Sequence, residues 1–392
     1  MKPTIGWMRV WLALMVVDLH SGFSDLLTRM WLVRHPASLA ARLNFAGDGN
    51  IAVIGFFIIS GYLVAHVVER KYDPGRLDHM VRFVVSRYMR IFPLFIACFV
   101  LFIVAALALI HGGVSQPPWQ IASNALLLPM GIQDLFARAA SPLYRHMTPD
   151  FWDATWTLPL DFLFYPLGFL LMRSRRLITL LLVALLAFQC YVWWRSPILP
   201  LNASGQWVHH GAKLTWWNLW YYTTVPATML PFLAGMQARL LPVSAPFRGW
   251  VVVLCTLAIS LLCFFPYGVS PFAAATAALA LFCVLIVELG KNGQGKREAL
   301  LGNFTYSLYL VHQFLAVAIL SLLGAYWIAV GVEGKLFEPM RRRLDAAIPR
   351  YLGGLQGVRV QPAAAWIAVC VGIFSVGWLL WLYQMHGWAV SV

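Results

Sequence analysis

The chain contains 392 residues, of which 61% are hydrophobic and only 11% are charged. Soluble domains are about one quarter charged, so this composition excludes an ordinary soluble protein and indicates a chain that crosses a lipid bilayer several times. The formal net charge of +14 does not indicate a nucleic-acid partner, because membrane proteins gather Lys and Arg in their cytoplasmic loops.

A membrane-spanning helix needs about 20 mainly apolar residues, and this criterion predicts about ten such helices. The expected fold class is therefore all-α, with residues 1–392 forming a single integral-membrane domain. The first predicted helix lacks a small-residue cleavage site after its apolar core, so we do not expect a signal peptide. In chain order the spans lie near 7–23, 51–68, 91–111, 155–172, 177–194, 218–237, 249–265, 272–289, 304–326 and 364–384.

Basic connections set the expected orientation of these spans. Residues 69–90, 173–176 and 290–298 are rich in Lys and Arg and fall on one side, which the positive-inside rule assigns to the cytoplasm together with the N-terminus. The two longest connections, 112–154 and 331–363, are then extracytoplasmic. The second is rich in Arg, so it is either an amphipathic helix on the membrane surface or a sign that one span has been miscounted.

The first span, near residues 7–23, carries ionisable side chains that a lipid-facing helix avoids. Each costs roughly 2.5 kcal/mol or more unless it faces a partner or a cavity. Arg9 and His20 are about 20° apart around a helix axis and about 16 Å apart along it, whereas Asp18 points away from His20. Taken singly, Arg9 is a topology anchor and His20 an interfacial histidine. Their shared face instead favours a long ligand that reaches both.

Other charged and polar side chains lie in or near later spans. Arg87 and Arg90 share a helical face, and guanidinium groups bind phosphate oxygens in a bidentate manner, although positive-inside charge explains them too. Asp161 lies inside the fourth span, where a carboxylate favours a functional role. His312 lies near the middle of a later span and by itself is more typical of a packed, hydrogen-bonded histidine than of a catalyst.

The sequence predicts no metal site and no nucleotide loop. All six cysteines lie inside apolar runs without metal-ligand spacing, and the pair 209–210 of histidines has no third ligand nearby. The segment 290–297, GKNGQGKR, approaches a P-loop, but Arg297 replaces the Ser or Thr that the motif needs.

Six motifs occur in order along the chain. Together they resemble the membrane-bound acyltransferase-3 family, which includes polysaccharide O-acetyltransferases, over nearly the whole sequence. The motifs are R-x10-H in the first span, IAVIGFFIISGYL (51–63), F-x3-R-x2-RIFP (83–93), WTLPLDFLFYP (156–166), LPFLAGM (230–236) and LGNFTYSLYLVH (301–312).

This resemblance implies a multi-pass acyltransferase of the bacterial cytoplasmic (inner) membrane with its N-terminus inside. It implies acetyl-CoA or another acyl-CoA as the donor substrate, a hydroxyl of an extracytoplasmic glycan or glycolipid as the acceptor, and no metal. His20 is the implied catalytic base, with Asp161 as a second catalytic residue. Arg9, Arg87 and Arg90 are the implied donor-binding residues. Other polar residues of the helix bundle are Ser60, Trp156, Tyr165, Tyr306 and His312.

The chain departs from the family pattern at two places. The family usually carries Glu at the end of a Trp-Ser-Leu-x-x-Glu motif, where this chain has Asp161 after Trp156-Thr157-Leu158. Asp keeps the charge but is one methylene shorter. The Asp that often precedes a Phe-Phe pair is replaced by Ile54-Gly55, so we assign no role to that place.

A second class of function is compatible with the same buried charges. In a secondary transporter or a lipid or glycolipid flippase, buried Arg, Asp and His would line a translocation route. Such proteins often contain internal repeats, and we find none in this sequence. The sequence does not specify the acceptor, nor whether the acyl group is acetyl or succinyl.

Overall fold

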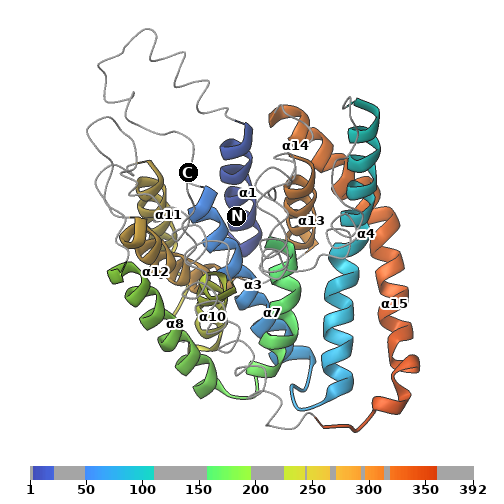
Figure 1. Ribbon diagram of the computed structural model, residues 1–392, viewed down its shortest axis with the longest axis horizontal. Coiled ribbons are helices and arrows are strands. Elements are labelled where there is room, and N and C mark those ends of the chain that lie inside the picture. Colours follow the sequence, from blue (N-terminus) through green and yellow to red (C-terminus); the bar gives the residue numbers. More distant parts are fainter. Residues whose placement is uncertain are drawn as a thin grey trace, which may run out of the picture. The chain divides into compact units, whose positions relative to one another are not determined.

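The computed structural model describes residues 3–21, 49–109, 157–195, 225–242, 245–264, 271–292, 296–312 and 318–359. All regular structure over these residues is helical, and the one β contact among them is an isolated bridge between Arg76 and Arg359. The predicted all-α class is therefore confirmed for the described part of the chain (Figure 1).

The described helices overlap nine of the predicted spans, the tenth, 364–384, lies outside the described residues, and the number of helices that cross a membrane stays a prediction. Two stretches are long and apolar enough to cross a membrane by themselves, Ile51–Lys71 and Leu77–Leu101. Shorter apolar helices occupy Ile5–Val17, Leu160–Leu171, Gly249–Leu262 and Ala274–Gly290. The helices are α1 (Ile5–Ser21), α3 (Gly49–Lys71), α4 (Leu77–Leu109), α7 (Thr157–Leu171), α8 (Arg175–Arg195), α10 (Val225–Leu240), α11 (Gly249–Phe264), α12 (Pro271–Gly290), α13 (Lys296–Val311), α14 (Ala318–Trp327), the π-helix η6 (Ile328–Phe337), α15 (Glu338–Tyr351) and the short 3-10 helix η7 (Gly353–Leu355).

The chain divides into two compact units, which we describe separately. Several helices pass from one unit to the other, so each unit is assembled from segments distant in sequence. Unit 1 comprises Met1–Ala52, Val84–Leu163 and Leu289–Tyr351, and unit 2 comprises Val53–Phe83, Phe164–Glu288 and Leu352–Val392.

In unit 1, α1 packs against α13, and α13 packs against both α14 and η6. The Asn292 side chain, just before α13, donates a hydrogen bond to the carbonyl of Pro3, just before α1, at 2.6 Å. Further along, Gly302 of α13 lies beside Arg9 of α1. Because both pairs advance in the same direction along the chain, α1 and α13 run parallel, with their first turns at the same level.

The single span expected at 304–326 is in fact divided between two helices. Helix α13 ends at Val311, and α14 begins at Ala318 and continues without a break through η6 into α15. Since η6 still contacts α13, the chain reverses direction between α13 and α14. The expected amphipathic helix in 331–363 is present as α15, and none of its side chains is buried.

Helix α4 begins at Leu77, well before the apolar run expected at 91–111. Residues 77–90 were expected to belong to a cytoplasmic loop, but Leu77, Val81, Val84 and Tyr88 recur at helical spacing and extend the helix backward. The connection to α3 is consequently a short turn, and Arg87 and Arg90 lie well inside a helix of 33 residues.

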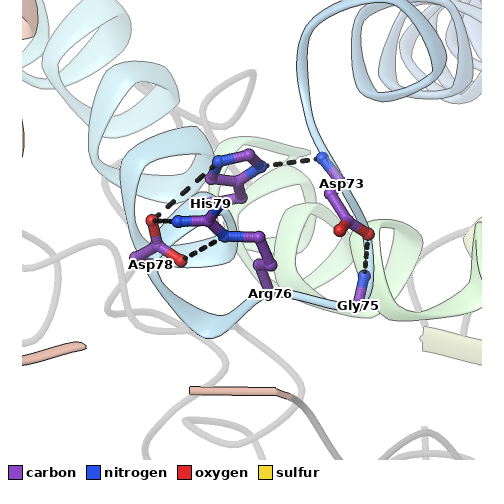
Figure 2. A network of polar contacts seen from close by, with 5 residues as sticks. All are labelled: Asp73, Gly75, Arg76, Asp78 and His79. Atoms are coloured by element: carbon purple, nitrogen blue, oxygen red, sulfur yellow. Dashed lines mark hydrogen bonds and ion pairs between the residues drawn. The ribbon is translucent and has the colours of Figure 1, made fainter. Parts of the chain in front are cut away.

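In unit 2 this turn is held by a compact network of polar contacts (Figure 2). The guanidinium of Arg76 donates to both carboxylate oxygens of Asp78 at 3.0 and 2.9 Å, and Asp78 is in the first turn of α4. The backbone N–H of Asp73 donates to Nδ1 of His79 at 2.8 Å, while the Asp73 carboxylate accepts from the N–H of Gly75. The hydrogen bond with Asp78 raises the pKa of Arg76 above its ordinary value, so this cation stays charged at physiological pH.

The same turn is joined to the end of the 331–363 segment. The N–H of Leu77 donates to the carbonyl of Val358 at 3.0 Å, and Arg76 forms the isolated bridge with Arg359. Two segments on opposite faces of a membrane cannot meet in this way. We therefore expect Val358 and Arg359 on the same side of the membrane as the turn before α4, and the sidedness of 331–363 stays a prediction.

Glycines set the packing of α3 against α10 in unit 2. A Cβ on Gly61 would lie 1.8 Å from the carbonyl oxygen of Phe232, and one on Gly235 would lie 2.0 Å from that of Ile58. Such approaches of backbone to backbone are possible only without a side chain, as at small-residue crossings of membrane helices. The motifs 51–63 and 230–236 thus form one tight helix crossing.

Candidate functional site

Two guanidinium groups meet at Gly302 of α13. A Cβ on Gly302 would lie 2.9 Å from Nη1 of Arg9 and 3.3 Å from Nη2 of Arg90. Arg9 belongs to α1 and Arg90 to α4, so the absence of a side chain at Gly302 lets cations from two other helices reach α13. We refer to Arg9 and Arg90 as the arginine pair. Like charges brought this close favour a nearby anion.

One face of α13 holds this part of unit 1 together. Gly302, Tyr306 and Tyr309 follow the i, i+4, i+7 pattern and therefore share that face. The Tyr306 hydroxyl donates to the carbonyl of Ile91 in α4 at 2.7 Å. The hydroxyls of Tyr309 and of Thr157 in α7 are 2.7 Å apart. The motif 301–312 thus connects α13 to α4 and to α7.

Arg87 is placed differently from the arginine pair. It lies three residues before Arg90 in α4 and is partly exposed, but it is not among the atoms within 4 Å of the added Cβ at Gly302. Of the three arginines predicted to bind the donor, the structure therefore brings Arg9 and Arg90 together at one point.

His20 lies in the last turn of α1, and its side chain is outside the described residues. The prediction that His20 and Arg9 share one helix holds for the backbone, because α1 includes both. His312 follows Gly302 along α13 by nearly the same interval that separates His20 from Arg9 on α1. Because the two helices run parallel, we place the backbones of His20 and His312 at a similar level, about 15 Å beyond the arginine pair.

His312 itself is buried, with 4% of its surface exposed. Its Nδ1 lies 2.8 Å from the carbonyl of Tyr309 and 3.2 Å from that of Leu308. Carbonyl oxygens only accept, so Nδ1 carries a proton and Nε2 is the basic nitrogen of the neutral ring. This agrees with the expectation of a packed, hydrogen-bonded histidine, and the side chain satisfies carbonyls at the end of α13.

The other predicted residues are distributed over both units. Asp161 is half-buried on α7, one turn after Thr157, and Trp156 lies outside the described residues. Tyr165 is buried in unit 2, where its ring meets that of Phe83 edge-on at 6.2 Å. Ser60 lies on α3 beside the glycine crossing and is partly exposed.

Two charged residues near the arginine pair were missed from sequence: the partly buried Arg341 and the buried Glu333. Arg341 in α15 donates from Nη1 to the carbonyl of Arg90 at 3.0 Å and from Nη2 to Oε2 of Glu333 at 2.8 Å. Both fall in 331–363, which was expected to be a loop. The sign that could have revealed them is the apolar run AILSLLGAYWIAVGV, which continues up to Glu333 and is long enough for a further helix.

Unit 2 contains a separate polar cluster that the sequence analysis also missed. Arg239 in α10 forms an ion pair with Glu69 in α3 at 2.6 Å and donates to Nδ1 of His66 at 3.2 Å. The ring of Tyr62 stacks on that of His66. These contacts fasten the ends of α3 and α10 together, so we assign them to packing.

The described residues contain no group of three or more His, Cys, Asp or Glu side chains placed to hold a metal ion. Unit 1 brings two cations, Arg9 and Arg90, together beside Gly302. They lie at one end of a helix pair whose far end carries histidines, about 15 Å away along the helix axis.

A family model described as an acyltransferase domain matches residues 3–382. No curated protein and no solved structure is significantly similar to the chain. The family match includes all six motifs, the arginine pair and Gly302, and the apolar helices fit a protein of the membrane. This chain is a membrane acyltransferase that belongs to the acyltransferase-3 family.

Proposed function

We propose that this acyltransferase moves an acyl group, most simply acetyl, from acyl-CoA to a hydroxyl of an extracytoplasmic glycan or glycolipid. The observation that supports this best is the meeting of Arg9 and Arg90 over Gly302. The phosphates of CoA suit such a pair, because guanidinium groups bind phosphate oxygens through parallel hydrogen bonds. Arg87, on the same face of α4 as Arg90, adds a third cation for the donor.

The far end of α1 carries the proposed catalytic base. An imidazole with an ordinary pKa is largely neutral near pH 7 and can accept a proton. His20 is about 16 Å along the helix axis from Arg9, a distance suited to the long, thin arm that joins the phosphates of CoA to its thioester. The arginine pair thus holds the anionic end while the thioester lies near His20.

At the reacting centre, His20 takes the proton of the acceptor hydroxyl as its oxygen attacks the thioester carbon. A C–O bond forms, the C–S bond breaks, and His20 returns the proton to the leaving sulfur. Asp161 lies on α7, in the unit that also contains α1, and we assign its carboxylate to the acceptor side of this reaction. No metal is required, because the thioester is already activated.

The protein's setting is proposed on composition and charge. The basic connections place the N-terminus and the donor on the cytoplasmic face of a bacterial inner membrane. About ten helices or more would cross that membrane, and the acceptor would meet His20 from the outside. The phosphate end of acyl-CoA therefore stays at the cytoplasmic face, its arm reaches along α1, and only the acyl group passes to the acceptor.

The test uses membranes that contain the full-length protein, supplied with acetyl-CoA labelled in its acetyl group. We expect label in envelope glycan or glycolipid, and we expect His20→Ala to lower the initial rate at least about 100-fold, the contribution typical of a general base. The control is His79→Ala, which changes a histidine in the first turn of α4 and should keep the rate within about twofold of the unsubstituted protein.

Two outcomes contradict the proposal. Full acyl transfer by His20→Ala would remove the assignment of the base. Uptake or movement of a solute or lipid without any transfer of label would instead support the transporter or flippase alternative.

A further inference from the structure

Arg341 is tied to the backbone that carries the arginine pair. Its guanidinium donates at once to the main-chain carbonyl of Arg90 and to the carboxylate of Glu333. The side chains of Arg341 and Glu333 are only 14% and 2% exposed. Because both Nη atoms of this guanidinium form hydrogen bonds and the side chain is largely shielded from solvent, Arg341 has little freedom to move. It therefore fixes the backbone of α4 at Arg90, whose side chain reaches Gly302.

The sequence of α4 explains why this point needs support. Pro93 lies inside the helix and has no N–H to donate to the carbonyl of Met89, one turn earlier. The next two carbonyls along the helix, those of Arg90 and Ile91, accept side-chain donors from Arg341 and Tyr306. Two external hydrogen bonds thus brace α4 beside the place where its own ladder is interrupted.

Glu333 is held by an unusual backbone. It lies in η6, a π-helix of 10 residues, and its carbonyl accepts the N–H of Glu338 five residues later. Stretches of π-helix inside α-helices are rare and frequently occur at functional sites. The carboxylate oxygen Oε1 of Glu333 is buried without a hydrogen-bond partner among the described residues, and the charges of Arg341 and Arg90 both act on this carboxylate.

The neighbouring residue shows that this arrangement is not a general property of α15. Arg342 pairs with Glu338 on the exposed side of the helix, where the two side chains are 79% and 39% exposed. Arg341 and Arg342 are adjacent and equally charged, but Arg341 is only 14% exposed and bonds to α4, whereas Arg342 faces outward. They form a matched pair for experiment.

We propose that Arg341, held by Glu333, is a positioning residue that orients Arg90 for the phosphate groups of a nucleotide-containing thioester donor. This inference rests on the proposed function. Arg341 acts through the backbone of α4, and Glu333 supplies the countercharge that allows the cations to gather. The 331–363 segment is thereby part of the donor site, although it follows the last of the six motifs.

The experiment measures binding of acetyl-CoA to the purified full-length protein in lipid nanodiscs by titration calorimetry. We expect Arg341→Gln to raise the Kd about tenfold, Arg341→Lys to give an intermediate value, and Arg342→Gln to stay within about twofold of the unsubstituted protein. Arg341→Gln and Arg342→Gln remove the same charge, so a difference between them cannot come from net charge.

Loss of one partner leaves the buried carboxylate of Glu333 unpaired, so we expect Arg341→Gln to lower stability as well as affinity. The double variant Glu333→Gln with Arg341→Gln removes both charges and separates the two effects. We expect its thermal midpoint without donor to return close to that of the unsubstituted protein, while its Kd stays about tenfold higher. Recovery of the Kd in the double variant would mean that Arg341 is only structural.

The binding experiment distinguishes failure of the proposed acyl-CoA donor from failure of the proposed role of Arg341. If the unsubstituted protein binds no acetyl-CoA, the proposed donor is wrong and the role of Arg341 is wrong with it. If the unsubstituted protein binds acetyl-CoA and Arg341→Gln binds it equally well, the donor assignment stands and the positioning role alone is wrong.

Discussion

Gly302 contributes to the site because it has no side chain. Any side chain there would occupy the place taken by the guanidinium groups of Arg9 and Arg90. A glycine inside a helix costs about 1 kcal/mol relative to alanine, so its presence in α13 is unfavourable for the helix alone. The compensation is the access that it gives to two cations from other helices.

We therefore expect Gly302→Ala to weaken binding of acetyl-CoA several-fold, a change of about 1 kcal/mol, without lowering the thermal stability of the protein. The new methyl group would displace the flexible ends of two arginines and leave the backbone in place. Kd from calorimetry and the midpoint of thermal unfolding in nanodiscs measure the two effects.

The control for this variant is Gly331→Ala in η6, where the nearest atom to an added Cβ is 3.9 Å away, an ordinary contact. This control should leave both the Kd and the midpoint unchanged. If Gly302→Ala binds acetyl-CoA like the control, the arginine pair is not the phosphate site.

At the residue scale, sequence reasoning identified Arg9 and Arg90 but not what joins them. Helical spacing alone placed Arg9 on the face of His20, because that relation is local to one helix. The meeting of Arg9 with Arg90 depends on three helices distant in sequence. Gly302 was seen only as part of a motif, since a glycine carries no chemistry of its own from which to infer a neighbour.

At the scale of elements, the crossing of α3 and α10 in unit 2 brings two backbones into direct contact. Gly61 and Gly235 each face a carbonyl oxygen of the opposite helix at a distance that no Cβ can occupy. Here, unlike at Gly302, the obstacle is backbone and cannot swing aside. The two kinds of glycine therefore predict opposite results on substitution.

We expect Gly61→Ala to destabilise the protein by at least about 2 kcal/mol, because the two helices must separate or distort. The measurement is the thermal midpoint in nanodiscs, compared with Gly353→Ala in η7, where no atom lies within 4 Å of an added Cβ. An unchanged midpoint for Gly61→Ala would show that the crossing is looser than described.

Helices were predicted well where apolar runs are bounded by polar turns, and poorly where they are not. The start of α4 was missed because its first turns alternate charged and apolar residues, which hydropathy scores as a loop. The expected span 304–326 merged two helices because the chain stays apolar through their reversal. Hydropathy indicates whether a segment lies in lipid or in water. It does not indicate where the chain reverses direction.

At the scale of the whole molecule, the hydrogen bond between Leu77 and Val358 joins two connections, which we therefore expect on one face of the membrane. We expect single cysteines at Lys71 and Gln356, each introduced after replacement of the six native cysteines, to react from the same side. A membrane-impermeant maleimide should label both in inside-out vesicles and neither in intact cells, if the positive-inside rule holds.

Labelling of these two cysteines from opposite sides would contradict the described bridge. Labelling of both from the outside would keep the bridge and reverse the proposed orientation.

Arg9 and the backbone of His20 belong to one unbroken helix, and this has a consequence for substrate choice. In the proposed function Arg9 binds the donor and His20 is the base, so α1 sets a fixed distance between the two groups. A thioester donor whose arm is too short would bind at the arginine pair but would not bring its thioester to His20, whatever acyl group it carries. On the proposed roles of Arg9 and His20, we therefore expect the enzyme to select the donor by the length of its arm and to tolerate different acyl groups.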